Sequence, residues 1–418
     1  MSTEWPRLDY LGWRETCSAL HLFLQIVGKY RLAHTPWLNH SWNATFYVTP
    51  TGLASSLIPD GPGIELLFDF REHLLLGTCG NGHQASFALG PTTVAAFRAE
   101  FVKLITDLRG TPSFNDTPNG VPYPVPFSED HRDRPYDREA VQRYHRALVA
   151  MDRVFHRFRT SFVGKSSPVH LFWGALDLAV TRFSGRRAPL HPAGIPFLPD
   201  DVAQEAYDRE LSAAGFWPGG NGIDYPAFYT YAYPSPTGYR SAPVRPNAAF
   251  WQEGLSEFIL PYDAVQTASD PEETLMAFLV STYEVAANLG GWDRDLLECA
   301  HGRPRQARAP NATRTIAALA TDGTVEREDG PSKGRYRLVV DGVEAEMSYS
   351  RVSASQIIID HTEIPDALRG RKVGARLLQQ AIEDARQDKV VIIPLCPFAK
   401  AMIGRHPEWQ DVLPPSKT

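Results

Sequence analysis

One segment divides this chain into two parts. Residues 301–314 read HGRPRQARAPNATR, with four arginines, two prolines and no acidic residue. The segment has neither the 3.6-residue apolar period of a helix nor the two-residue period of a strand. A segment of this kind has no apolar face to bury, so we interpret residues 301–320 as a linker. We therefore expect two domains, residues 1–300 and residues 321–413.

Composition excludes several classes of protein. The 418 residues are 43% hydrophobic and 22% charged, which is typical of globular rather than disordered chains. The formal net charge of −6 gives no reason to expect a nucleic-acid partner. The four cysteines are scattered and none forms a C-x-x-C pair, so we expect neither a disulfide framework nor a metal site. With no signal-peptide pattern and no long apolar run, the expectation is a cytoplasmic protein with no membrane partner.

For residues 1–300 we expect a large α+β domain, within an α/β (α+β) chain. Apolar residues at helical spacing predict helices at 18–27, at 92–108 and after the N-cap candidate Asp137, and Asp270-Pro271 is a typical helix start. Strand-like runs occupy 45–49, 64–70, 84–89 and 169–173. We interpret 112–135 as a long surface loop and 186–246, rich in Pro, Gly and aromatic residues, as irregular.

The last 100 residues follow a clearer pattern, β-β-β-α-β-α. The predicted strands are 335–340, 343–352, 356–364 and 389–395, and the predicted helices are 370–388 and 397–405. Asp341-Gly342 between the first two strands is a strong hairpin signal.

The first candidate site is the strand–turn–helix segment IPDALRGRKVGARLL at 364–378. A helix N-terminus presents unpaired N–H groups and a positive dipole end, which suits a phosphate. Four basic residues add cations, and Gly370 and Gly374 allow close backbone approach. The alternative is an ordinary solvated helix start.

The second candidate site lies at the end of the following strand. Cys396 directly precedes a helix that begins with Pro397, so it is a candidate N-cap whose thiol feels the helix dipole. The alternative is a buried small hydrophobe, which most free cysteines are.

The third candidate site is the pair His361 and Glu363 at the end of another strand. Because side chains alternate along a strand, we expect both on the face of Ile357 and Ile359. Either residue could accept a proton from an amine. The alternative is a pair hydrogen-bonded to a loop.

Taken together, these pieces resemble a known family. The strings HTEIPDALRGRKVGARLL (361–378), VIIPLCPF (391–398) and RHPEW (405–409) are similar to the short, YjdJ-type branch of the GNAT superfamily of acetyl-CoA-dependent N-acetyltransferases. The resemblance covers about residues 321–413. It implies a minimal GNAT fold, with acetyl-CoA between two splayed parallel strands, and an amine acceptor that is a small molecule or a protein lysine or N-terminus.

The resemblance also implies roles for individual residues. The window 369–374 corresponds to the superfamily's pyrophosphate loop, although Lys372 replaces its middle glycine. Cys396 would lie near the thioester. The amine would either attack the thioester directly or receive the acetyl group from Cys396 in a ping-pong route. His361 or Glu363 would be the base. The implied acetyl-CoA contacts are Ile364, Arg369, Gly370, Arg371, Lys372, Val373, Gly374, Ala375 and Pro397.

The first 300 residues resemble a bacterial domain-of-unknown-function family, which implies no activity. The resemblance runs from Trp5 to about Glu298. It rests on WPxLxY at 5–10, QIVGK at 25–29, NHSW at 39–42, SPVH at 167–170, FWG at 172–174, DLAVTRFSGR at 177–186 and AGFWPG at 214–219.

The densest polar stretch of the first domain is 164–192, set among aromatic residues. One interpretation is a pocket for an anionic small molecule, and the other is a structural network of paired groups. The pocket candidates are His170, Asp177, Arg182, Arg186 and His191.

Three hypotheses for the whole chain follow. In the first, the C-terminal domain acetylates an amine that the large domain binds. In the second, it is a CoA-binding sensor without turnover, which the Lys372 departure favours. In the third, the large domain is a separate enzyme. Nothing in the sequence specifies the acceptor or an oligomeric state.

Overall fold

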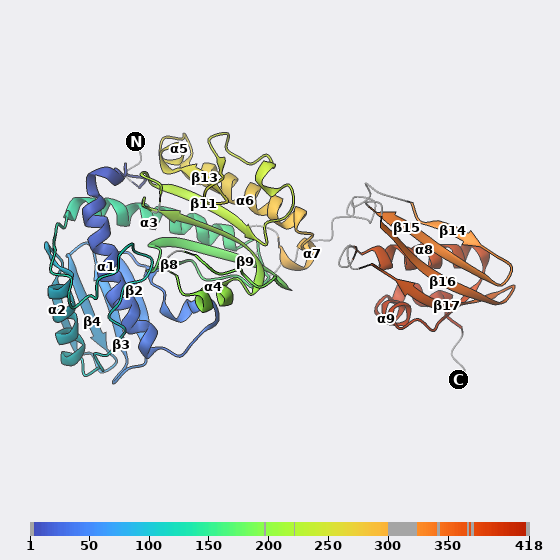
Figure 1. Cartoon of the computed structure of the whole chain (residues 1–418), viewed down its shortest axis with the longest axis horizontal. Helices are drawn as coiled ribbons and strands as arrows, with labels where there is room; N and C mark the ends of the chain where they lie inside the picture. Colours follow the sequence, from blue (N-terminus) through green and yellow to red (C-terminus); the bar gives the residue numbers. More distant parts are fainter. Residues whose placement is uncertain are drawn as a thin grey trace. The chain divides into compact units, whose positions relative to one another are not determined.

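The computed structural model describes residues 4–195, 198–220, 222–299, 324–340, 343–365, 368 and 372–414. The chain divides into two compact units, Met1–Ala309 and Pro310–Thr418, which we treat separately (Figure 1). The predicted linker 301–320 and the predicted hairpin turn Asp341-Gly342 lie outside the described residues.

The first unit contains two main antiparallel sheets. The five-stranded sheet has the order β1(Tyr47–Val48), β2(Gly52–Ile58), β3(Ile64–Asp69), β4(Leu74–Cys79), β5(Gln84–Ala88). The six-stranded sheet has the order β12(Phe250–Gln252), β13(Glu257–Pro261), β11(Ala227–Tyr233), β10(Arg209–Trp217), β9(Asp177–Arg187), β8(His170–Phe172). A short pair joins β6(Thr92–Thr93) to β7(Asp133–Arg134).

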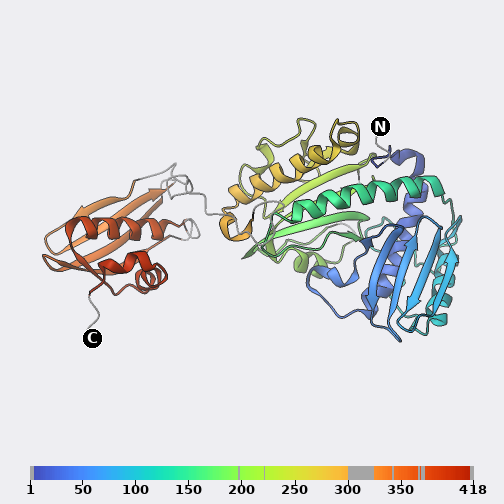
Figure 2. The ribbon, with the colours of Figure 1, turned by 180° about the vertical axis from the view of Figure 1, so that it is seen from behind.

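Helices pack on both sheets. Helices α1 and α2 contact the five-stranded sheet, and α3 and α6 cover one face of the six-stranded sheet (Figure 2). The helical elements are α1(Tyr10–His34), η1(Asn39–Ala44), α2(Val94–Asp107), α3(Arg138–Arg159), α4(Asp200–Ala206), η2(Tyr239–Ser241), α5(Tyr262–Gln266), α6(Pro271–Leu289) and α7(Arg294–Leu297).

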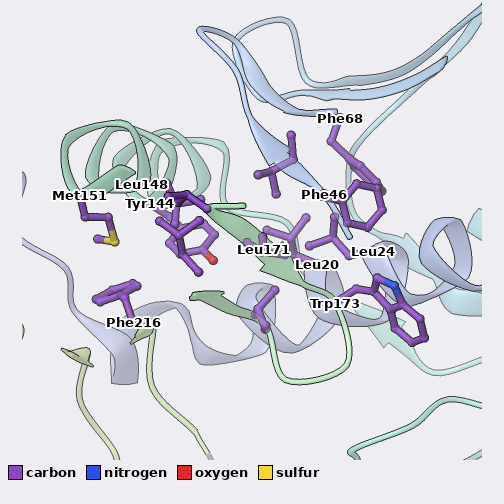
Figure 3. Close-up of a cluster of buried hydrophobic side chains, with 14 of the residues drawn as sticks. Leu20, Leu24, Phe46, Phe68, Tyr144, Leu148, Met151, Leu171, Trp173 and Phe216 are labelled. Carbon is purple, nitrogen blue, oxygen red and sulfur yellow. The ribbon is translucent and has the colours of Figure 1, made fainter. Parts of the chain in front are cut away.

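The two sheets share one hydrophobic core. Side chains from α1, α3 and both sheets meet in a single cluster (Figure 3). Its fully buried members include Leu20, Phe68, Tyr144 and Phe216. The large first unit is therefore one packed body rather than two separate sheets.

Local signals placed the helices well. Asp137 caps α3 and accepts a hydrogen bond from the Ala140 N–H at 3.0 Å, and Asp270 caps α6, as predicted. Helix α1 extends beyond the predicted 18–27 in both directions. Residues around most of its circumference are buried, and some of them are polar, so the apolar stripe in the sequence covers only part of the helix.

The prediction that residues 186–246 are irregular is wrong. They contain β10 and β11, two inner strands of the six-stranded sheet. Leu211–Phe216 of β10 and Ala227–Thr230 of β11 are buried on both faces, so the polar–apolar alternation that marks a half-exposed strand is missing there.

The second unit is one five-stranded sheet with two helices. The strand order is β14(Glu326–Asp329), β15(Lys333–Val340), β16(Val343–Ser353), β17(Gln356–Glu363), β18(Val391–Pro394), and β17 and β18 are parallel while the other neighbours are antiparallel. The remaining elements are α8(Val373–Asp388), α9(Pro397–Arg405) and η5(Pro407–Val412). The predicted β-β-β-α-β-α order is present, with β14 before it and η5 after it.

Candidate functional site

Strands β17 and β18 begin as a parallel pair and then part. Gln356–Ile359 pair with Val391–Pro394, and the Cys396 N–H donates to the Ile359 carbonyl at 3.0 Å. Beyond that bond β17 continues for four residues to Glu363, whereas the segment that follows β18 enters α9. The end of β17 therefore lies along the point where the two strands separate.

Cys396 is the N-cap residue of α9, as predicted. Its side chain is 3% exposed, and Sγ lies 3.4 Å from Thr362 Oγ1 instead of capping the helix. The thiol thus faces the inner side of β17. Sequence reasoning missed Thr362, although it lies inside the quoted HTE string.

The prediction that His361 and Glu363 share a face with Ile357 and Ile359 is wrong. The pairing with β16 shifts between Tyr349↔Ile359 and Ser348↔His361, which leaves Asp360 as a bulge. An extra residue in a strand exchanges the faces of everything after it. Both candidate bases are therefore exposed on the outer face of the sheet, and Thr362 takes the inner face beside Cys396.

The start of α8 is partly described. Arg369, Gly370 and Arg371 lie outside the described residues, and Lys372 is an exposed N-cap with φ 57°, in the left-handed region. The first turn of α8 has no acidic residue, so nothing there offsets the positive end of the helix dipole. Of the other predicted acetyl-CoA contacts, Val373 is buried, Ile364 and Ala375 are half-buried, and Pro397 is exposed.

Gly374 has a packing role that the sequence did not indicate. A Cβ added there would lie 2.7 Å from Cζ of Phe398 in α9. The missing side chain at Gly374 leaves room for the Phe398 ring, and so lets α8 and α9 pack closely.

The five pocket candidates of the first unit do not converge on one site. Arg182 is 1% exposed, donates to Ser161 Oγ at 3.0 Å and lies over the Phe158 ring at 3.4 Å, on the face covered by α3. Burial lowers its pKa to about 10. Asp177 lies an odd number of residues away on the regular strand β9, and so on the opposite face.

The other three candidates have separate surroundings. His170 is buried against the Pro168 carbonyl at 2.8 Å, and burial lowers its pKa to about 4. Arg186 pairs with Glu210 at 2.6 Å on the surface, and His191 stacks on Tyr207 at 4.6 Å. An anion pocket built from these five residues is therefore not formed.

A carboxyl group that sequence reasoning missed has one buried oxygen and is electrostatically coupled to Asp177. It is Glu257, the first residue of β13, whose pKa is raised to about 8 by burial first and by the charge of Asp177 second. No pattern in the sequence marks it. In the described part of the chain, no helix is both long and apolar enough to cross a bilayer.

Comparisons with known proteins agree with this architecture. A family of unknown function, DUF5996, matches residues 5–299, and the GCN5-related N-acetyltransferase family matches residues 335–412. Among solved structures, a GCN5-like N-acetyltransferase candidate from Staphylococcus aureus, determined by NMR, is 34% identical over 22% of this chain and 91% of its own, with a TM-score of 0.19. No curated protein matches.

The two family matches fall one in each compact unit, and the second contains the parallel strands that part at Cys396. The chain belongs to the family of unknown function DUF5996, and a GCN5-related N-acetyltransferase domain follows its family domain.

Proposed function

We propose that the C-terminal unit binds acetyl-CoA and transfers its acetyl group to an amine. The observation that carries the proposal is the separation of β17 and β18 at Cys396, within a domain of an acetyl-CoA-dependent family. Strand residues Asp360–Glu363 offer backbone beside the reacting group, where N–H donors can stabilise the oxyanion of acyl transfer.

The pyrophosphate of acetyl-CoA would bind at the start of α8. Backbone N–H groups of residues 372–375 would face the phosphates, the exposed Lys372 would supply a cation, and the uncompensated helix dipole favours the negative charge. The predicted contacts Arg369, Gly370 and Arg371 lie outside the described residues. Ile364 and Pro397 would contact the rest of the cofactor from either side of the strand separation.

The reaction balances without a further reagent. The neutral amine nitrogen attacks the thioester carbonyl carbon, a C–N bond forms and the C–S bond breaks. The nitrogen loses a proton as the amide forms, and the departing CoA sulfur takes up a proton, so that CoA leaves as the free thiol. A lysine-like amine has a pKa near 10.4, so it must lose a proton before it attacks. His361 or Glu363, on the outer face of β17, would take that proton from an acceptor that arrives from solvent.

Cys396 supports direct attack rather than a ping-pong route. Its thiol is 3% exposed and faces Thr362, so an acetyl-Cys396 intermediate would require this packed contact to open. We propose that Cys396 positions the end of β18 and that the acetyl group passes directly to the amine. The DUF5996 domain would bind the acceptor.

Turnover by the full chain tests the proposal. Release of free CoA thiol is followed with acetyl-CoA and a panel of amines: polyamines, free amino acids and a lysine-containing peptide. Cys396→Ala should keep activity within about tenfold, whereas His361→Ala combined with Glu363→Gln should lower kcat by about 10²–10⁴. Glu383→Gln, an exposed carboxylate on α8, is the matched control.

Loss of turnover in Cys396→Ala, with a trapped acetyl-enzyme in the wild type, would establish the ping-pong route instead. Binding of acetyl-CoA without turnover of any amine would favour the sensor hypothesis. Lys372→Glu tests the phosphate site and should weaken binding. Gly374→Glu is unsuitable, because its side chain would meet Phe398.

A further inference from the structure

A lysine and a histidine of the first unit form one hydrogen-bonded chain. Lys165 lies in the segment between α3 and β8, and its Nζ is 2.8 Å from Nε2 of His40 in η1. The other ring nitrogen, Nδ1, lies 3.1 Å from the Ala206 carbonyl at the end of α4. A carbonyl oxygen can only accept a hydrogen bond, so Nδ1 carries the proton of the neutral ring. Nε2 is therefore the atom that accepts a proton of Lys165.

The backbone around His40 is strained. His40 and Ser41 have φ of 59° and 54°, in the left-handed region that residues with a Cβ rarely adopt. Both oxygens of the Glu205 carboxylate accept the His40 backbone N–H, at 2.8 and 2.9 Å. Two strained residues in succession persist only where their surroundings impose the conformation, and such strain occurs most often at functional sites. Contacts with α4 thus fix the imidazole beside Lys165.

Two aromatic rings flank the amino group of Lys165. Nζ lies 4.8 Å from the ring centre of Phe183 and 5.4 Å from that of Trp42. The His40 ring is tilted against the same two rings, at 4.8 and 4.9 Å between centres. The rings displace water from one side of Nζ and hold it next to Nε2. Lys165 as a whole is exposed, so a small molecule in solution can reach the amine.

These surroundings favour the neutral forms of both groups. Burial lowers the pKa of Lys165, and the charge of Arg209 adds to this effect. The charges of Asp208 and Glu205 oppose it without reversing it. Burial first, and the charge of Lys165 second, lower the pKa of His40 to about 4, so its ring is uncharged near neutral pH. The pair therefore consists of an amine that loses its proton readily and a ring that is free to accept one.

A nucleophile, a base within hydrogen-bond reach and a third group that orients the base together characterise nucleophilic sites. Lys165, His40 and the Ala206 carbonyl occupy these three positions. We propose that Lys165 is a nucleophilic amine that takes the acyl group of a thioester, with His40 as its base. The choice of a thioester as donor rests on the proposed function, which brings acetyl-CoA to the same chain.

The step balances without another reagent. Neutral Nζ attacks the thioester carbonyl carbon and a C–N bond forms. The nitrogen passes its extra proton to Nε2 of His40, the C–S bond breaks, and the sulfur takes up a proton and leaves as the free thiol. The product on Lys165 is an amide. Because neutral Lys165 no longer lowers the pKa of the imidazole, His40 is a better base during the reaction than beside the ammonium.

The test labels the full chain with S-phenyl thioacetate and follows acetylation of each lysine by peptide mass spectrometry. Lys103, an exposed lysine of α2, is the internal control. Near pH 8, Lys165 should be acetylated at least about tenfold faster than Lys103. S-phenyl thioacetate carries no nucleotide and does not need an acetyl-CoA site. A second unit that fails to bind acetyl-CoA therefore cannot cause a negative result here.

His40→Asn removes the base, and asparagine adopts a left-handed φ more readily than most residues. This variant should lower the acetylation rate of Lys165 at least about tenfold and leave that of Lys103 unchanged. His83→Asn, at an exposed histidine between β4 and β5, is the matched control and should change neither rate.

The pH profile of the wild type is an independent measurement, which still decides the matter if His40→Asn fails to fold. Only the neutral amine reacts, so the rate at Lys165 should level off at a lower pH than the rate at Lys103. Equal rates at the two lysines would overturn the proposal. An unchanged Lys165 rate in folded His40→Asn would do the same, as would a Lys165 rate that levels off at the same or a higher pH than that of Lys103.

Discussion

Raising the pH should destabilise the first unit through Glu257. Burial raises the pKa of its carboxyl group to about 8, whereas the ordinary value is 4.5. Between these values the native chain holds a proton that the unfolded chain has lost. Stability rises with pH only where the unfolded state binds more protons, so here the free energy of unfolding must fall as pH rises.

The size of the effect is clearest above pH 6.5. Asp177, with its pKa raised to about 6, contributes in the same direction but only below that pH. His40 and His170, whose pKa values burial lowers to about 4, act oppositely, but only between about pH 4 and their ordinary 6.5. From pH 6.5 to 8 Glu257 acts alone among these four groups. At about 1.4 kcal/mol per pH unit, the free energy of unfolding should fall by about 2 kcal/mol.

The assay is urea unfolding followed by tryptophan fluorescence, since eight of the nine tryptophans precede residue 300 and Trp409 is the ninth. Wild type should lose the stated stability between pH 6.5 and 8, Glu257→Gln should not, and Glu65→Gln, at an exposed acid of β3, should follow the wild type. Parallel curves for wild type and Glu257→Gln would refute the reasoning, because they would show that Glu257 ionises normally in the folded chain.

Three further predictions concern packing and capping. Asp137→Ala should lower the free energy of unfolding of the first unit by about 1 kcal/mol in the same urea assay, because α3 loses its N-cap bond. Arg182→Ala should cost about 3 kcal/mol there, because it empties a stacked, buried site and removes the hydrogen bonds to the Phe158 carbonyl and to Ser161 Oγ; a cost below about 1 kcal/mol would contradict this. Gly374→Val should destabilise the second unit by about 1–3 kcal/mol, and Phe398→Ala should relieve the loss in a double-mutant cycle followed by circular dichroism; additivity would exclude the clash.

Local signals predicted a large part of the fold. Caps such as Asp137 and Asp270 mark helix starts because their side chains satisfy specific N–H groups in the next turn. The predicted order of the last 100 residues rests on regular alternation in β15 and β16 and on the apolar stripe of α8. These features depend on neighbours in sequence, so the sequence is enough to find them.

The parts that the sequence did not predict depend on neighbours in space. The bulge at Asp360 arises from the pairing of β17 with β16, and the residues IIIDHTE give no sign of it. The electrostatic coupling of Glu257 with Asp177 depends on two strands from distant parts of the chain. Strands β10 and β11 were missed because burial on both faces removes alternation.

The proposed acetyl transfer is tested most directly by amine-dependent release of CoA thiol from acetyl-CoA by the full chain, with and without Lys372→Glu. Thiol release that requires an amine and falls at least tenfold in the variant, mainly through the KM for acetyl-CoA, is the predicted result. Wild-type protein that neither binds acetyl-CoA nor releases thiol with any amine would contradict the proposed function.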